Sequence, residues 1–371
     1  MRLPSAVAAI LTLVAASTAT ARPVTDCPQR DDPFSIDLPL IDLLASPAAR
    51  AIVDRELPGA FDRAPKMFVS QTVPSFAALL SIRSATMIVT AKPGELARLD
   101  RELRALRVTQ ADKTTRCARY DNDVPWFSPP AGRPRILLFE KINGFRDGPS
   151  VAAARAAFLD MAKRNGWVVA VTDKGGAFNA VTLRQFDAVI WNNISGDVLT
   201  LSQRRAFRKW LEAGKGFIGV HGSAGDPTYF WDWYADSLIG ARFKGHPMWP
   251  QFQDAHVVVD DPDHPVVQGL PRQWIMNDEW YSFKASPRAS GSHIIATLDE
   301  STYKLQGMGQ DLQMGDHPIA WTRCVRSGRI FYSAIGHRPE IYSDPRYVRM
   351  LENAIDWAAT GRGPACRGKG D

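Results

Sequence analysis

The histidines of this chain are confined to one stretch of the sequence. The first 220 residues contain none, and the seven are His221, His246, His256, His264, His293, His317 and His337. Imidazole titrates near neutral pH and is the commonest metal ligand among side chains. The distribution therefore indicates metal ligation or proton transfer in this part of the chain.

His221 has the most informative local sequence. Gly-Val-His-Gly-Ser at 219–223 has the form of an elbow between a strand and a helix, which exposes its central side chain. Because that side chain is an imidazole, the elbow suits metal ligation or proton transfer rather than an acyl-enzyme mechanism. Ser223 lies two residues beyond the apex, which disfavours a serine hydrolase. The alternative is a histidine that only supports the loop through hydrogen bonds.

Two adjacent carboxylates, Asp278 and Glu279, stand beside two aromatic residues. In an extended segment neighbouring side chains point to opposite faces, so we expect at most one of the two carboxylates in a given pocket. With His221, His246 or His337 it would complete a site for a divalent, zinc-like ion that stays open to water. The other possibilities are a general base and a purely structural acid pair.

Regular elements must position these side chains. From residue 133 onward short apolar segments alternate with amphipathic ones, which is typical of βαβ units with buried parallel strands. Ligands of such sheets bind beyond the carboxyl ends of the strands, where four expected strands lead to residues 140–144, Asn192-Asn193, His221 and His337. We expect strands at 135–140, 167–172, 186–191, 216–221, 255–260, 293–298, 318–325 and 329–335, and helices at 149–165, 200–213 and 345–360.

The expected fold class is therefore α/β, with a doubly wound, mostly parallel sheet at residues 133–362 and a short tail at 363–371. Residues 22–132 differ from this pattern. Two amphipathic helices are expected there, at 37–57 and 90–106, separated by a proline-rich stretch. We expect a small, mainly helical accessory domain, in which no group of residues is suited to chemistry.

The first 21 residues match a secretory signal peptide. Arg2 is followed by a short apolar stretch and by Ala-Thr-Ala at 19–21, which suits cleavage after residue 21. The apolar stretch is short for a membrane span, and no other stretch reaches about 18 apolar residues. We therefore expect a periplasmic or secreted protein without a membrane span.

The cysteines agree with an exported protein. Four are present, and an even count in an oxidising compartment favours disulfides. Of the three possible pairings, Cys27 with Cys117 and Cys324 with Cys366 is the simplest. Buried free thiols are the alternative.

Neither a nucleic acid nor a nucleotide cofactor is expected as a partner. The chain has 371 residues and a formal net charge of +6, but no clustered Lys/Arg patch, so nucleic-acid binding is not expected. Gly-Lys-Gly-Phe-Ile-Gly at 214–219 closes an expected helix and enters a strand, the reverse of a dinucleotide-binding turn. No nucleotide cofactor is therefore expected. The oligomeric state stays open, a homo-oligomer included.

Several motifs in a fixed order resemble the ThuA-like (trehalose-utilisation) family over residues from about 133 to 361. They are Gly-Val-His at 219–221, Asp226, Trp-x-Trp-Tyr at 231–234, Gly-His-Pro at 245–247, Asp-Glu-Trp-Tyr at 278–281, His-Pro-Ile-Ala-Trp at 317–321 and Gly-His at 336–337. The resemblance implies a flavodoxin-like fold of the class I glutamine-amidotransferase-like type, without the catalytic cysteine, and a link to sugar metabolism. Family members commonly place a histidine after Gly-Phe-Arg at 144–146, whereas this chain has Asp147, so a histidine role is not carried over to that position.

Together these observations predict an exported protein that acts on a small carbohydrate. The expected catalytic residues are His221, Asp278, Glu279 and His337, the metal ligands His221, His246, His337 and Glu279, and the ligand contacts Asn192, Asn193, Asp226, Trp231, Trp280 and Tyr281. Trp and Tyr suit stacking on sugar faces, although they also form cores. The expected chemistry is that of an isomerase, lyase or hydrolase on a keto-sugar or glycoside derivative, and not that of a glutamine amidotransferase. The alternative is a non-catalytic carbohydrate-binding or assembly domain.

Overall fold

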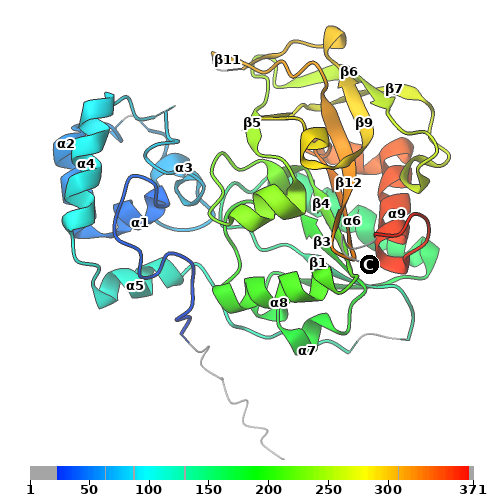
Figure 1. Ribbon diagram of the computed structural model, residues 1–371, viewed down its shortest axis with the longest axis horizontal. Coiled ribbons are helices and arrows are strands. Elements are labelled where there is room, and N and C mark those ends of the chain that lie inside the picture. The colour runs from blue at the N-terminus through cyan, green and yellow to red at the C-terminus, as the bar shows by residue number, and fades with distance from the viewer. Residues whose placement is uncertain (1–22, 63, 87, 129–130, 308, 367–371) are drawn as a thin grey trace, which may run out of the picture.

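The computed structural model describes residues 23–366, apart from 63, 87, 129, 130 and 308 (Figure 1). The expected signal peptide and the end of the expected tail lie outside the described residues. Within the described part of the chain, no helix is long and apolar enough to cross a membrane.

A nine-stranded sheet forms the centre of the larger part of the molecule, in the order β2-β1-β3-β4-β13-β12-β9-β6-β7. The first five strands are parallel, and the last four extend the sheet as an antiparallel wing. The strands are β1 (Arg135–Phe139), β2 (Val168–Thr172), β3 (Ala188–Asn192), β4 (Gly216–Val220), β6 (Phe252–Val259), β7 (Gln273–Glu279), β9 (His293–Asp299), β12 (Pro318–Val325) and β13 (Gly328–Ser333).

Helices cover both faces of the parallel half of this sheet. α6 (Gly148–Asn165) and α9 (Pro345–Thr360) contact each other, and α8 (Leu201–Glu212) lies with the short α7 (Ala180–Leu183) on the opposite face (Figure 1). The crossovers from β1 to β2 and from β2 to β3 run in opposite directions along the sheet. Because crossovers between parallel strands are as a rule right-handed, their helices belong on opposite faces. The predicted α/β fold class is therefore confirmed.

Smaller elements connect the strands. A π-helix, Trp233–Ile239, follows β4, and two small sheets pair β5 (Phe243–Gly245) with β8 (Ser282–Phe283) and β10 (Gln306–Gly307) with β11 (Gln310–Asp311). The 3-10 turns are Phe76–Ala78, Gly175–Ala177, His221–Ala224, Pro265–Val267, Pro287–Ser290, Glu300–Thr302 and Pro339–Ser343.

The N-terminal region is helical and has an apolar core of its own, distinct from the core around the sheet. Its helices are α1 (Leu40–Ala45), α2 (Pro47–Glu56), α3 (Lys66–Val69), α4 (Pro93–Ala105) and α5 (Gln110–Cys117). One helix was expected over residues 37–57, but the structure has two. Pro47 begins the second of them, because a residue before proline is driven out of the α conformation and Ser46 is extended.

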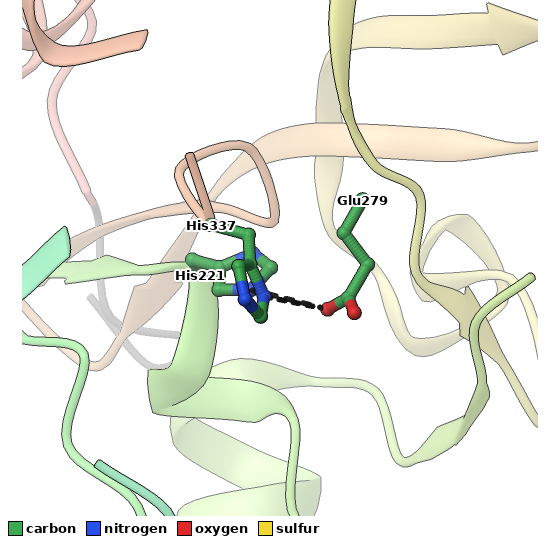
Figure 2. A group of neighbouring side chains, drawn as sticks. All are labelled: His221, Glu279 and His337. Atoms are coloured by element: carbon green, nitrogen blue, oxygen red, sulfur yellow. Dashed lines mark hydrogen bonds and ion pairs between the residues drawn. The ribbon is translucent and has the colours of Figure 1, made fainter. Parts of the chain in front are cut away.

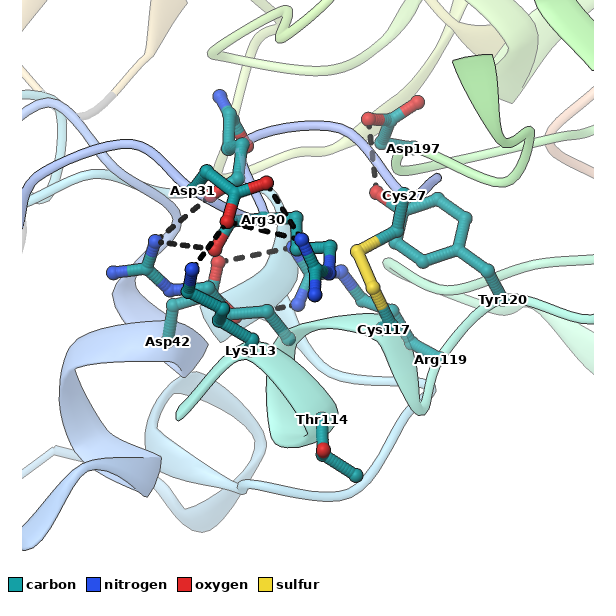
Figure 3. Close-up of a disulfide and its surroundings, with 12 residues drawn as sticks. Cys27, Arg30, Asp31, Asp42, Lys113, Thr114, Cys117, Arg119, Tyr120 and Asp197 are labelled. Atoms are coloured by element: carbon teal, nitrogen blue, oxygen red, sulfur yellow. Dashed lines mark hydrogen bonds and ion pairs between the residues drawn. A yellow bond between two sulfur atoms is a disulfide. The ribbon is translucent and has the colours of Figure 1, made fainter. Parts of the chain in front are cut away.

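Both predicted disulfides are confirmed, Cys27–Cys117 and Cys324–Cys366. The first lies beside a buried ion pair between Arg119 and Asp42, in which the Arg119 Nη2 to Asp42 Oδ2 distance is 3.0 Å (Figure 3). The next residue, Tyr120, donates its hydroxyl to Asp197 of the α/β region at 3.0 Å. These contacts attach the end of the helical region to the sheet.

Breaking the Arg119–Asp42 pair from one side should destabilise the protein strongly. Asp42→Asn leaves the Arg119 guanidinium buried without its counter-charge, which costs about 3–5 kcal/mol of the free energy of unfolding. Asp37→Asn is the matched control, because it breaks the Asp37–Arg83 pair, whose side chains are 50% and 60% exposed, and such pairs contribute ~0–1 kcal/mol. Urea unfolding followed by tryptophan fluorescence measures both, and equal losses in the two variants would contradict this expectation.

Candidate functional site

His221, Glu279 and His337 come together although the chain separates them widely. His221 follows β4 directly, His337 stands in the loop after the neighbouring strand β13, and Glu279 is the last residue of β7. That loop reaches β7 because the backbone N–H groups of Gly336 and Arg338 donate to Asp278 at 2.6 and 3.0 Å. Two of the three residues thus lie at carboxyl ends of parallel strands, as expected for an open α/β sheet.

The three side chains point toward one another (Figure 2). One carboxylate oxygen of Glu279, Oε2, lies 3.4 Å from His221 Nε2 and 3.0 Å from His337 Nδ1, and the two ring nitrogens are 3.1 Å apart. Each residue offers one ligand atom, and these atoms all lie within 4.8 Å of one another. Glu279 is buried, and His337 is the most accessible of the three.

Both histidine rings are also held from behind. His221 Nδ1 lies 2.7 Å from the carbonyl oxygen of Ala334, so it carries the proton and leaves the lone pair on Nε2. His337 Nε2 lies 3.3 Å from Asp147 Oδ2, so this carboxylate can hold a proton on Nε2 when Nδ1 gives its lone pair to a metal ion; without an ion, Nδ1 lies within hydrogen-bond distance of Glu279 Oε2, at 3.0 Å. Metal-binding histidines show this arrangement, in which the outer N–H is bound to a carbonyl or carboxylate.

The charge of Glu279 is maintained against its burial. Burial favours the neutral acid, but when the two rings carry a proton on the nitrogen that faces Glu279, their hydrogen bonds and the nearby imidazoles outweigh burial and hold the pKa of Glu279 well below its usual value. Burial also opposes the imidazolium form of His337, yet its hydrogen bond to Glu279 and the surrounding carboxylates raise its pKa. A proton and a metal ion would therefore compete for the same nitrogen atoms.

Strained backbone surrounds the site at the ends of β3 and β4. Asn193 and His221 have φ angles of 54° and 37°, which residues with a side chain rarely adopt. Gly336 has a φ of 131°, and a Cβ atom there would lie 2.4 Å from the Tyr342 hydroxyl. Only glycine therefore fits immediately before His337.

The neighbouring acid, Asp278, has a different environment. It is fully buried, and its two oxygens accept the backbone N–H groups of the loop that carries His337. Burial raises its pKa. As the extended geometry predicts, the two carboxylates diverge, and Asp278 holds the loop while Glu279 faces the histidines.

His246 lies at the other oxygen of Glu279. Its Nδ1 is 3.2 Å from Glu279 Oε1 and 3.0 Å from its neighbour's carbonyl, Pro247 O. Gln251 also donates to Glu279 Oε1. His246 therefore contacts the predicted site without joining the group of three ligand atoms.

Tyr281 and His317 pack around the site and hold the backbone next to Glu279 in place. The Tyr281 ring packs on His221, with centroids 4.3 Å apart. His317 donates Nε2–H to the Tyr281 carbonyl at 2.9 Å, and its Nδ1 lies 2.8 Å from Glu300 Oε1. This chain of contacts fixes the segment that follows Glu279.

The polar residues expected as ligand contacts are buried. Asn192 donates to Glu140 and to the Val151 carbonyl, and Asn193 donates to Asn192 and to the Tyr342 hydroxyl. Their contacts are therefore with protein atoms, at the strand end that borders His221.

Asp226 is also buried and ties two loops together. It accepts the Ser195 hydroxyl and the Gly196 N–H, both at 2.8 Å, and burial raises its pKa to about 7. Ser195 in turn accepts the N–H of Phe145, so Asp226 acts on the loop after β1. The contacts make it a residue that positions this loop.

The tryptophans expected to stack on a sugar occupy other places. Trp280 is fully buried and donates its indole N–H to the Gln253 carbonyl. Trp231 packs against Trp233 and under the Arg204 guanidinium, beside a cavity of about 30 Å³ that has room for little more than water. The aromatic rings that flank His337 are instead Phe145 and Phe252.

Sequence reasoning missed Gln251, Phe145 and Phe252, and it left the role of Asp147 open, between metal binding and proton transfer. Asp147 stands where the family commonly has histidine, and that difference was the available signal. Phe252 and Gln251 reach the site because the start of β6 pairs with the end of β7, where Phe252 lies opposite Glu279. Nothing in their local sequence indicates this pairing.

Comparison with known proteins agrees with this architecture. The family model ThuA, described as trehalose utilisation, matches residues 135–358, more than half of the chain. A ThuA-like protein from Bacteroides uniformis is 26% identical, with a TM-score of 0.53, and the match covers 64% of this chain and 95% of that one. A second, from Parabacteroides merdae, is 17% identical with a TM-score of 0.47, and the match covers 64% and 92%. No curated protein matches.

The matched segment contains the whole sheet, and with it His221, Glu279 and His337. The resemblance inferred from the motifs is thereby confirmed. The chain belongs to the ThuA, or trehalose utilisation, family.

Proposed function

We propose that this protein is an exported, sugar-active enzyme whose centre holds a divalent metal ion on His221, Glu279 and His337. The chemistry is proton transfer, elimination or hydrolysis on a keto-sugar or glycoside derivative. The observation that carries the proposal is the convergence of two imidazole nitrogens and one carboxylate oxygen, at 3.0 to 3.4 Å from one another.

These distances are close to those around one ion. Tetrahedral ligands at ~2.0–2.2 Å from a zinc ion lie roughly 3.3–3.6 Å from one another, so the His337 nitrogen would move by a few tenths of an ångström on binding. Ala334 and Asp147 orient the two rings so that one nitrogen of each faces inward. With these three protein ligands, a fourth position would stay open to water or substrate, as in catalytic zinc sites. When bound, such an ion lowers the pKa of its water and polarises a carbonyl oxygen.

His246 is the group best placed to move a proton. Its Nδ1 faces Glu279 and the Pro247 carbonyl, so Nδ1 carries the proton and Nε2 has the free lone pair. Its side chain is 22% exposed, against 3% for Glu279. In this proposal His246 takes a proton at Nε2, and Glu279 stabilises the imidazolium that results.

The family description and the disulfides support the other two parts of the proposal. The trehalose-utilisation family points to a sugar as the ligand. Two disulfides in a chain of this size are typical of an oxidising compartment, which agrees with the expected signal peptide.

The metal site has a graded test. The wild-type protein, stripped of metal and titrated with zinc chloride in a calorimeter, should bind one equivalent. His221→Ala and Glu279→Gln remove ligands and should weaken binding by more than 100-fold, whereas Asp147→Ala removes an orienting partner and should weaken it by about 10–100-fold. His293→Ala is the control, because His293 is paired with Asp261 at the surface. Zinc binding of equal affinity in His221→Ala and wild type would refute the site.

The proton-transfer role has a separate test. His246→Ala, assayed at saturating zinc, should lower kcat by about 10²–10⁴-fold, because it removes a general base and leaves the three metal ligands in place. Trehalose and its keto derivatives, followed by NMR, are the first substrates to assay. Zinc-loaded wild-type protein that binds these sugars without converting them would favour the carbohydrate-binding alternative.

A further inference from the structure

Two partly exposed phenylalanines border the proposed centre. Phe145 follows β1, and its ring centroid lies 6.3 Å from that of His337. Phe252 begins β6 and lies 5.2 Å from His337. Their exposed fractions are 36% and 38%, which is high for apolar rings packed beside buried charged groups. Apolar surface at a polar centre is typical of a ligand-binding wall.

This aromatic surface continues into the helical region. Phe76 lies against Phe145, with centroids 5.2 Å apart, and Phe68 stacks on Phe76 at 4.7 Å. Phe68 and Phe76 are partly exposed, and Met67 beside them is 46% exposed. Both phenylalanines precede residue 135, where the family match begins. We call Phe145, Phe76 and Phe68 the aromatic row.

Close backbone contact holds the aromatic row in place. The Ser75 N–H donates to the Asn143 carbonyl at 3.0 Å, two residues from Phe145. At Gly144 an added Cβ would lie 2.1 Å from the Leu79 side chain, so glycine is needed for the two segments to approach. Farther along, the Thr228 and Ser84 hydroxyls are 2.8 Å apart. Phe76 is therefore positioned relative to His337 by direct contacts as well as by the chain.

We propose that the helical region completes the ligand site, with Phe145 and Phe76 as the wall of a second sugar subsite. One ring of a disaccharide lies at His221, Glu279 and His337, and its second ring packs its apolar C–H face on the aromatic row. This inference rests on the proposed function, because it takes the first ring to bind at that centre. Aromatic rings contribute dispersion and apolar burial to such contacts.

The occupant follows from the chemistry and location of the row. It begins at a buried, charged centre that suits a polar ring, and it continues as the partly exposed apolar surface of stacked aromatic rings, which suits the C–H face of a second ring. A monosaccharide held at the centre would leave Phe76 and Phe68 uncovered. The helical region would then act in specificity for the size of the sugar, a role that the matched family segment alone does not supply.

The test compares trehalose with glucose on zinc-loaded, full-length protein by calorimetry. Wild type should bind trehalose more tightly than glucose. Phe76→Leu retains apolar volume but loses the flat ring, so it should weaken trehalose binding by about 3- to 10-fold, the equivalent of the aromatic contact, and leave glucose binding within about twofold. Trp126→Leu is the control for an exposed aromatic residue, because Trp126 is 85% exposed and lies outside the row.

The outcomes separate the two proposals. If Phe76→Leu weakens both sugars equally, or leaves the preference for trehalose intact, Phe76 has only a packing role and the second subsite is refuted. Phe68→Leu provides a second measurement if Phe76→Leu unfolds, and it should shift the same preference. Wild type that binds zinc but neither sugar would refute the sugar ligand and the subsite together, while the metal site would stand on its own test.

Discussion

The carboxylate of Glu279 joins parts of the molecule that are far apart in the sequence. One of its oxygens faces His221 and His337 and the other faces His246, so four segments of the chain meet at one buried charge. A buried carboxylate is costly unless it is paired and hydrogen-bonded. The loops that carry these histidines therefore have to be fixed by other contacts, and much of the surrounding structure serves that end.

Those supporting contacts are mostly made by backbone and by buried polar side chains. Asp278 binds the N–H groups of the His337 loop, Ala334 orients His221, and Asp147 orients His337. His221 itself has a strained backbone, which persists only where the surroundings over-determine it. The rings consequently face one another with little freedom, which is the preorganisation that the proposed metal centre requires.

The parallel half of the sheet was predictable because its signals are local. Buried apolar strands, helix caps such as Thr200 and terminal glycines such as Gly361 mark each unit within a few residues. These signals are sufficient to predict that His221 and His337 lie at one edge of the sheet. β7 was not predicted. Its buried positions include Asp278, and an acid at a buried position breaks the alternation of apolar and polar residues by which a strand is recognised. The contact between Phe145 and Phe76 could not be predicted either, because Phe76 belongs to a separate helical region about 70 residues earlier in the chain.

The N-terminal helical region is attached to the α/β region by buried hydrogen bonds and ion pairs as well as by the chain itself. Asn143, two residues before Phe145, donates its amide to the Arg119 carbonyl at 3.3 Å and to the Asp197 carbonyl at 2.6 Å. Arg119 is paired with Asp42 of the helical core, and Asp197 is paired with Arg204 of α8. The loop that presents Phe145 is therefore fixed between the two cores. Because buried polar contacts are directional, they set the position of Phe76 relative to His337 more narrowly than apolar packing alone would, and a binding surface shared by the two regions needs that constraint.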